Sequence, residues 1–368
     1  MHEKLKDFRN FLYLAWKHLR LPAPSTMQYS IADYIANGDK RIIISAFRGV
    51  GKSWITSTYV LWRLLLDPQI NILVVSASKN RADDFSTFCL RLLSEMPILL
   101  HLKPKGDQRQ SKISFDVAPA LASHQPSVKS LGITSQLTGS RADLIIADDI
   151  ETSGNTQTQF MRDKLGEAIK EFEAIVKPEG SRTIFLGTPQ TEQSIYNKLQ
   201  ERGYKIRYWT ARYPSEKQLK SYGSNLAPII GNTWEHELIG KATDPLRFDE
   251  KDLLEREASY GRIGFNMQFQ LDTTLSDLDR YPLKLKDLVV LNLNPTTAPE
   301  KVVWASSPEL QWNDLPNVGL QGDGYFRPMQ TQGDWIDFTG CVMSVDPSGK
   351  GKDETAYCVT KILNGNIK

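Results

Sequence analysis

The sequence is poor in the residue types that cross-link or metallate small proteins. Its 368 residues contain three cysteines, Cys89, Cys341 and Cys358, and five histidines. An odd number of scattered cysteines gives neither a disulfide framework nor a zinc-binding spacing. The pattern therefore predicts a reduced cytosolic protein whose thiols are buried.

Long apolar runs and a large excess of one charge are also missing. No stretch approaches the roughly 18 apolar residues of a membrane helix, so we expect no membrane association. Lys and Arg number 45 against 43 Asp and Glu, which gives a net charge of +2. This balance excludes a protein that is basic over its whole surface, but a local basic surface still permits nucleic-acid binding.

Four short apolar runs predict the strands of a buried sheet. They cover residues 42–44, 72–75, 144–147 and 183–186. None alternates with polar residues, as is typical of parallel strands that are covered on both faces. Helical patterns separate the runs, so the predicted fold class is α/β.

A phosphate-binding loop follows the first run. Residues 46–53 read A-F-R-G-V-G-K-S between a predicted strand and a predicted helix, which is the context that a P-loop requires. Lys52 would reach the β- and γ-phosphates of ATP, and the Ser53 hydroxyl would ligate Mg²⁺. Ala46 stands where the motif usually has its first glycine. The predicted nucleotide-binding residues of the loop and the helix start are Phe47, Arg48, Gly49, Val50, Gly51, Lys52, Ser53 and Trp54.

Carboxylates follow the third apolar run. Asp148 and Asp149 end it directly, and Glu151 comes two residues later. We expect Asp148 to hold Mg²⁺ and Asp149 to orient or deprotonate the attacking water. Glu151 is a rival for that catalytic role, although capping of the following segment is the alternative interpretation.

Two further residues are candidates by position. Thr188 ends the fourth run in G-T-P and would sense the γ-phosphate, unless it is an ordinary strand-to-turn residue. Gln28 precedes the P-loop strand and would read the adenine edge, unless it is a surface residue. The predicted cofactors are ATP and Mg²⁺.

Together these motifs resemble the large terminase subunit of tailed bacteriophages, the DNA packaging ATPase, and most of all that of short-tailed phages. The resemblance rests on Gln28, residues 41–54, 76–78 and 138–143, Asp148, Asp149, residues 187–189, 211–214 and 261–270. It implies a P-loop NTPase with an additional-strand, RecA-like parallel sheet and a helical lid. It also implies an ATP-driven motor subunit that moves double-stranded DNA into a procapsid.

The resemblance further implies partners and a location. The partners are the portal protein and procapsid, the small terminase subunit, and other copies of the chain in a ring, a pentamer by family likeness. The expected location is the host cytoplasm, transiently at the procapsid portal. Arginine candidates for completing a neighbour's site are Arg48, which could also act within its own subunit, Arg81, Arg141 and Arg212.

An RNase H-like nuclease domain is the last implied part. Residues 343–347 read M-S-V-D-P and match its first strand, so Asp346 would be a metal-binding acid, although a plain strand boundary explains the residues equally well. Two-metal cleavage needs further carboxylates. We therefore expect the front of a longer protein, with endonuclease activity only at full length.

The predicted organisation has four parts. They are an ATPase domain at 1–215, a lid at 216–280, a proline-rich linker at 281–340, and the first nuclease strands at 341–368.

Two other functions stay open. One is a helicase or remodeller, disfavoured because residues 190–368 show no second parallel α/β lobe. The other is an assembly protein that binds ATP without hydrolysing it. This function is compatible with the two departures from the usual motifs, Ala46 in place of glycine and Asp149 in place of glutamate.

Overall fold

The computed structural model describes residues 2–190, 193–272, 284–305, 307–316, 318, 323–348, 355–363 and 366–367. The chain divides into two compact units, Met1–Ser276 and Asp277–Lys368. Within the described residues, no helix has both the length and the apolar character needed to cross a membrane.

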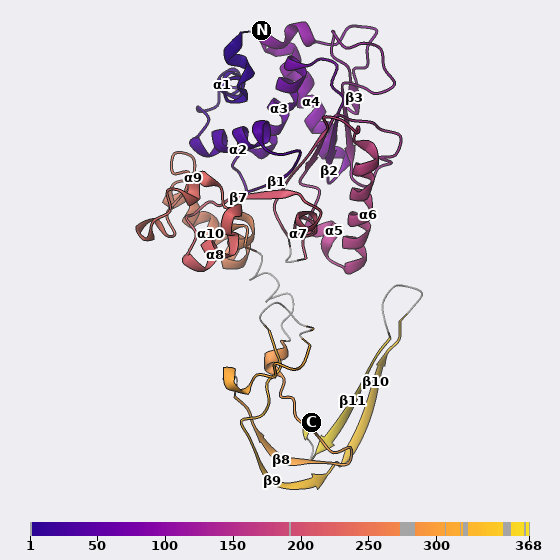
Figure 1. Ribbon diagram of the computed structural model, residues 1–368, viewed down its shortest axis with the longest axis vertical. Helices are drawn as coiled ribbons and strands as arrows, with labels where there is room; N and C mark the ends of the chain where they lie inside the picture. Colours follow the sequence, from indigo (N-terminus) through magenta and orange to yellow (C-terminus); the bar gives the residue numbers. More distant parts are fainter. Residues whose placement is uncertain are drawn as a thin grey trace. The chain divides into compact units, whose positions relative to one another are not determined.

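A seven-stranded sheet forms the centre of the first unit (Figure 1). Its order is β3-β4-β2-β5-β6-β1-β7, and every pairing is parallel except that of β3 with β4. The strands are β1 (Arg41–Ala46), β2 (Ile72–Ser76), β3 (Ser114–Phe115), β4 (Val128–Gly132), β5 (Leu144–Asp148), β6 (Arg182–Gly187) and β7 (Lys205–Trp209). The four apolar runs are β1, β2, β5 and β6, which confirms the α/β prediction.

The strand order places β6 between β1 and β5. The strand that leads into the phosphate loop and the strand that ends in carboxylates are therefore separated by one more strand. That is the additional-strand arrangement, and it brings the ends of all three strands to one edge of the sheet.

Helices cover both faces of this sheet. Adjacent residues of a strand point to opposite faces, so Ile42 and Ile44 join one apolar cluster and Ile43 joins the other. The first cluster includes residues of α1 to α4, and the second includes residues of α6 and α7. In α1 the predicted apolar face is buried through Phe8, Phe11, Leu12, Ala15 and Trp16.

The helical segments of the first unit follow in chain order, with α8, α9 and α10 gathered beyond the edge strand β7 in Figure 1. They are η1 (Glu3–Lys6), α1 (Phe8–His18), α2 (Thr26–Asn37), α3 (Lys52–Leu66), α4 (Lys79–Glu95), η2 (Pro97–Leu102), α5 (Ser153–Thr156), α6 (Gln159–Ile175), α7 (Ile195–Glu201), α8 (Glu216–Tyr222), η3 (Gly223–Asn225), α9 (Pro228–Gly231), η4 (His236–Leu238), α10 (Glu250–Phe265) and the π-helical η5 (Asn266–Gln270).

The second unit consists of small antiparallel sheets. Its strands β8 (Thr297–Val303) and β9 (Gln330–Asp337) pair with each other, and β10 (Gly340–Asp346), β11 (Ala356–Leu363) and β12 (Asn366–Ile367) form a second sheet. Two short 3₁₀ turns, η6 (Leu285–Asp287) and η7 (Pro308–Leu310), accompany them.

The prediction of buried thiols is right for one cysteine and wrong for two. Cys89 is buried in α4, whereas Cys341 and Cys358 are exposed. The physical reason is that these two residues lie on β10 and β11, whose residues are mostly exposed.

Candidate nucleotide-binding site

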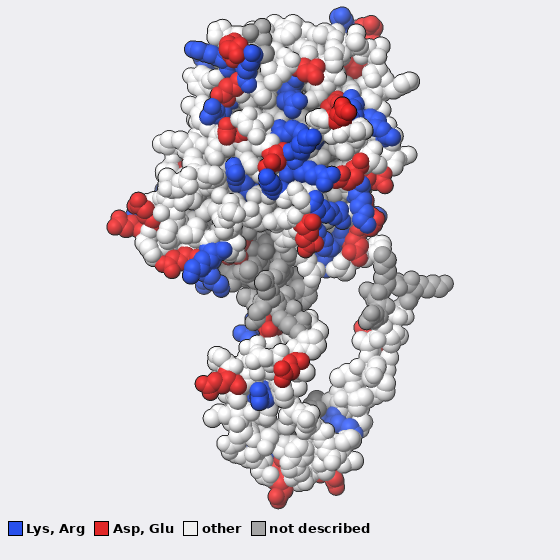
Figure 2. All heavy atoms as spheres, viewed as in Figure 1, with Lys and Arg blue, Asp and Glu red and all other residues white. Residues whose placement is uncertain are grey.

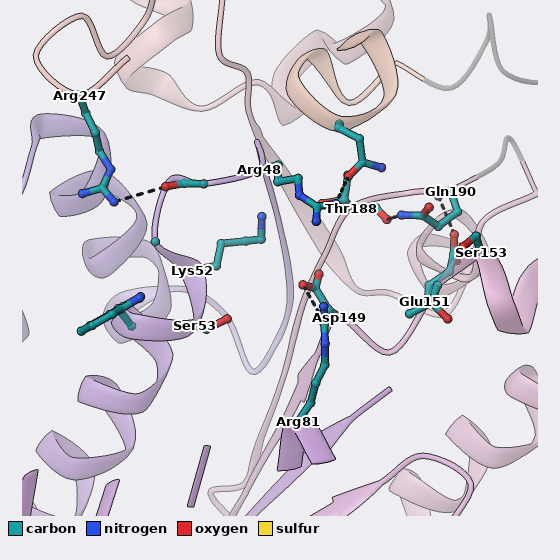
Figure 3. A pocket seen from close by; sticks show the side chains of 15 residues that line it. Arg48, Lys52, Ser53, Arg81, Asp149, Glu151, Ser153, Thr188, Gln190 and Arg247 are labelled. Carbon is teal, nitrogen blue, oxygen red and sulfur yellow. Dashed lines mark hydrogen bonds and ion pairs between the residues drawn. The ribbon is translucent and has the colours of Figure 1, made fainter. Parts of the chain in front are cut away.

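A cavity of about 420 Å³ opens where β1, β5 and β6 end. Ligands of parallel α/β sheets bind at this carboxyl edge. Figure 3 shows charged side chains from several elements converging on it. The lining residues are Arg48, Gly49, Gly51, Lys52, Ser53, Trp54, Arg81, Asp149, Glu151, Thr152, Ser153, Thr188, Gln190, Arg247 and Gln268.

The loop between β1 and α3 has the backbone of a phosphate cradle. Gly49 and Gly51 adopt φ angles of 92° and 97°, which favour glycine. A Cβ atom at Gly49 would lie 3.0 Å from the Phe248 ring, and one at Gly51 would lie 3.0 Å from the Gln28 amide nitrogen. Ala46 belongs to β1 and is not among the residues with positive φ, so this position has no conformational need for glycine.

Lys52 begins α3 and its side chain points into the cavity (Figure 3). Its ammonium group donates to the carbonyl oxygens of Ala46 and Phe47. Burial lowers the pKa of Lys52, and the charges of Asp149 and Asp148 oppose that shift. An anion in the cavity would compete with the two carbonyl groups for this ammonium.

Ser53, which follows Lys52 in α3, and Asp148, which ends β5, form a pair of oxygen ligands. The Ser53 hydroxyl donates to Asp148 Oδ2 at 3.3 Å, and Asp148 Oδ1 is buried without a hydrogen-bond partner among the described residues. Burial, followed by the charge of Asp149, raises the pKa of Asp148 to about 7. A cation at the free oxygen would satisfy it and favour the ionised form.

The donor set of this pair fits Mg²⁺. That ion prefers hard oxygen ligands, and it commonly takes one or two from the protein while water and substrate phosphates supply the rest. Across the described residues, no group of three or more His, Cys, Asp or Glu side chains could hold a metal ion by itself. The pair therefore suits an ion that arrives with a nucleotide.

Asp149 follows β5 in an unusual backbone conformation. Its φ is +46°, which is rare for a residue other than glycine and often marks a functional position. Its amide donates to the Leu186 carbonyl at 2.8 Å, and its carboxylate forms a 3.4 Å ion pair with Arg81 of α4. The carboxylate therefore faces the cavity beside a cation (Figure 3).

Glu151 has a different environment from Asp149. It is 2% exposed, and its carboxylate accepts hydrogen bonds at 2.8 Å from the Gln190 amide, the Ser194 hydroxyl and the Ile195 amide. Burial raises its pKa, and these three donors oppose the shift. The side chain thus holds the start of α7 rather than capping α5, and both of its oxygens are occupied.

The remaining predicted residues divide between the cavity and its surroundings. Thr188 lines the cavity, and Arg48 lines it while its Nη1 atom lies 3.4 Å from Gln268 Oε1. Gln28 is buried beside the loop and does not line the cavity: its amide nitrogen donates to the Val50 carbonyl at 2.8 Å, and its amide oxygen accepts from Ser25 N. Asp346 ends β10 in the second unit. The roles assigned to these residues stay predictions.

Several cavity residues carry no sequence motif that singles them out. Arg247, Gln268 and Gln190 enter the site from segments far from the P-loop in the chain. Gln268 falls in the segment 261–270 that contributed to the family resemblance. Nothing in the local sequence distinguishes Arg247 from the other arginines.

The fold and the site define a P-loop protein of the additional-strand class. The chain is 48% identical over 371 aligned residues to the terminase large subunit of Enterobacteria phage T3, and the alignment covers 98% of this chain. The chain is therefore similar to a phage large terminase subunit, which confirms the resemblance, and the short-tailed variant fits the T3 protein. It spans 63% of the length of the T3 protein. No family model matches the chain.

Comparison with solved structures gives only weak similarity, to phage terminases among others. The ATPase domain of the Thermus phage P74-26 large terminase is 12% identical, with a TM-score of 0.42 over 70% of this chain and 97% of that one. The HK97 large terminase is 15% identical, with a TM-score of 0.44 over 73% of this chain and 55% of that one. The relationship to phage terminases is seen in the 48% sequence identity to the T3 protein.

Proposed function

We propose that this chain is an ATP-driven motor subunit that translocates double-stranded viral DNA into a procapsid. One observation carries the proposal. Lys52, Ser53, Asp149 and Thr188 converge on one cavity, in a chain 48% identical over 98% of its length to the terminase large subunit of phage T3. The name of the T3 protein supports the packaging role, and the cavity supports the hydrolysis of a nucleoside triphosphate.

The cofactors in this proposal are ATP and Mg²⁺. Lys52 would leave the carbonyl groups of Ala46 and Phe47 for the β- and γ-phosphates, while the loop amides and the start of α3 hold the remaining phosphate oxygens. Ser53 and Asp148 would hold Mg²⁺, which supplies positive charge against the transferring phosphoryl group.

Asp149 is the catalytic carboxylate of the proposal. It would orient a water molecule against the γ-phosphate and accept its proton. Arg48 would add positive charge from within the loop, and Arg81 already pairs with Asp149. Thr188 would sense the presence of the γ-phosphate. Glu151 would carry any movement of the Thr188 loop to Asp149, because its carboxylate ties together the segments after β5 and β6.

The other parts of the chain receive roles by family likeness. Residues 1–215 would be the ATPase domain, 216–280 the lid, 281–340 a linker, and 341–368 the first strands of a nuclease with Asp346 as a metal ligand. Endonuclease activity would belong to a longer protein.

The partners of the proposal are double-stranded DNA, the portal protein and procapsid, the small terminase subunit and further copies in a ring. The place of action would be the host cytoplasm, transiently at the portal. Figure 2 shows Lys and Arg side chains gathered on one face of the first unit, interspersed with Asp and Glu. Such a surface suits contacts to phosphates, which need no base specificity.

Phosphate release by the purified chain tests the proposal. We expect ATP hydrolysis that rises with DNA and procapsids, and its loss in Lys52→Ala with the fold intact by circular dichroism. Binding of ATP without phosphate release under all of these conditions would favour the non-hydrolysing assembly protein. A Lys52→Ala variant that hydrolyses ATP like the wild type would remove the P-loop from the mechanism.

A further inference from the structure

Arg247 brings a guanidinium group to the phosphate loop from a distant part of the first unit. It lies in the turn before α10 and lines the same cavity as Lys52. Its Nη2 atom is 3.4 Å from the Gly49 carbonyl oxygen and would be 3.9 Å from a Cβ atom on Gly51. The group therefore flanks the loop at its two left-handed glycines.

The charge of this arginine is not neutralised by a salt bridge. No carboxylate among the described residues pairs with it within 4.0 Å. Its charge does act on Asp244 of the same turn, where it opposes the rise in pKa that burial causes. Arg256, on α10, is different because Asp252 accepts from its Nε atom at 2.7 Å. An exposed guanidinium that has no carboxylate partner among the described residues, beside a phosphate loop, is available to a ligand.

The turn that carries Arg247 is anchored at two points, to the start of α2 through Ser25 and to the phosphate loop through Phe47. The Asp244 carbonyl accepts from the amides of Arg247 and Phe248 at 3.1 and 2.8 Å, and the Asp244 carboxylate accepts from the Ser25 hydroxyl at 2.7 Å. The buried Phe248 ring meets Phe47 edge-on, with 5.2 Å between centroids. The Arg247 side chain itself is held only by the 3.4 Å hydrogen bond to the Gly49 carbonyl and by its position 5.9 Å from the centroid of the Phe248 ring, so it can still turn toward a ligand.

The positions of the charged groups give the cavity a direction. In Figure 3 the Lys52 ammonium points toward the side where Asp149 and Thr188 lie, and Arg247 lies on the opposite side of the loop. A nucleotide with its terminal phosphate near Asp149 would place its nucleoside end toward Arg247. Gln28, which also approaches Gly51, already uses both ends of its amide within the protein.

We infer that Arg247 binds the nucleoside end of the ATP, with its guanidinium plane stacked on the base. A planar, weakly hydrated guanidinium stacks on aromatic rings, and a lysine ammonium does not reproduce that contact. The inference rests on the proposed function, since it requires ATP in the cavity. It assigns to the lid segment a direct contact with the bound nucleotide.

Competition binding on the whole chain tests this inference. The affinities for ATP and for inorganic tripolyphosphate are measured in the wild type, Arg247→Ala, Arg247→Lys and Lys251→Ala. Lys251 is the matched control, because it lies in the same segment with 85% of its side chain exposed and does not line the cavity. Lys52→Ala reports separately on the phosphate loop.

We expect both Arg247 variants to bind ATP about tenfold more weakly. Lys251→Ala should match the wild type, and the tripolyphosphate affinity should not change in Arg247→Ala. Wild-type affinity in Arg247→Ala would overturn the inference. Rescue by Arg247→Lys, or an equal loss of tripolyphosphate binding, would overturn it in favour of a phosphate contact. Failure of the proposed function has another signature, in which the wild type binds no ATP or binds it independently of Lys52.

Discussion

Glu151 accepts a 2.8 Å hydrogen bond from the backbone amide of Gln190, and this contact joins the segment after β5 to the segment after β6. Glu151 lies two residues beyond Asp149, and Gln190 lies two residues beyond Thr188. The contact therefore links the proposed catalytic carboxylate to the proposed γ-phosphate sensor. The two carboxylates have different environments. Asp149 faces the cavity beside Arg81, whereas both oxygens of Glu151 accept hydrogen bonds within the protein.

The first prediction follows from this division of roles. Asp149→Asn should lower the rate of ATP hydrolysis by roughly 10²- to 10⁴-fold, as expected for loss of a general base, and should leave ATP binding intact. Glu151→Gln should act mainly on folding. It replaces an acceptor of three donors by an amide that can itself donate, and should lower the free energy of unfolding by about 1–3 kcal/mol.

Steady-state hydrolysis and thermal unfolding of both variants distinguish the roles. If Glu151→Gln abolishes turnover at unchanged stability while Asp149→Asn keeps its turnover, the two assignments are exchanged.

A second prediction concerns pH and Asp148. The pKa of this residue rises from its ordinary 3.8 to about 7 in the folded protein. The folded state therefore binds a proton more tightly than the unfolded state, so this contribution to stability is complete below pH 3.8 and is lost as the pH rises through 7. In EDTA, the free energy of unfolding should fall more steeply between pH 5 and 7 in the wild type than in Asp148→Asn.

Mg²⁺ should counteract this fall, because it binds the ionised carboxylate and stabilises the folded state. The measurement is urea unfolding at a series of pH values, with and without the ion. Equal slopes in the wild type and Asp148→Asn would show that Asp148 does not carry the pH dependence.

A third prediction concerns the departure from the P-loop motif at Ala46. This residue belongs to a buried strand and is not among the residues with positive φ, so a glycine would bring no conformational benefit. Ala46→Gly should leave ATP turnover unchanged and lower stability by about 0.5–1 kcal/mol.

The comparison is Gly49→Ala, where a methyl group would meet the Phe248 ring at 3.0 Å with φ at 92°. That variant should lose both nucleotide affinity and stability. Higher turnover in Ala46→Gly than in the wild type would mean that the missing glycine limits the enzyme.

The fourth prediction tests assembly. If a ring completes each site with a neighbour's arginine, the specific ATPase activity should rise steeply with protein concentration or with procapsids. DNA binding should be independent of sequence and should weaken strongly with salt, because phosphate contacts dominate it. A dilution series at two salt concentrations measures both effects. Activity per subunit that stays constant throughout would indicate a monomer that works alone.

The sequence by itself was sufficient for the fold class and the centre of the site. Runs of apolar, often β-branched residues predicted β1, β2, β5 and β6 because strands that are buried on both faces have no polar side to alternate with. The loop at 46–53 was recognisable because phosphate binding needs glycines, a lysine and a hydroxyl at fixed spacing along one stretch of chain. Such local requirements are visible in a linear sequence.

Other features were decided only by tertiary structure. Asp149 and Glu151 look alike in sequence, and their difference comes from what surrounds each one: Arg81 beside the first, and the start of α7 around the second. Arg247 has no motif at all, and it reaches the cavity because packing of Phe248 against Phe47 brings together residues 201 positions apart. The exposure of Cys341 and Cys358 likewise depends on which layers cover β10 and β11, and no local pattern encodes such long-range packing.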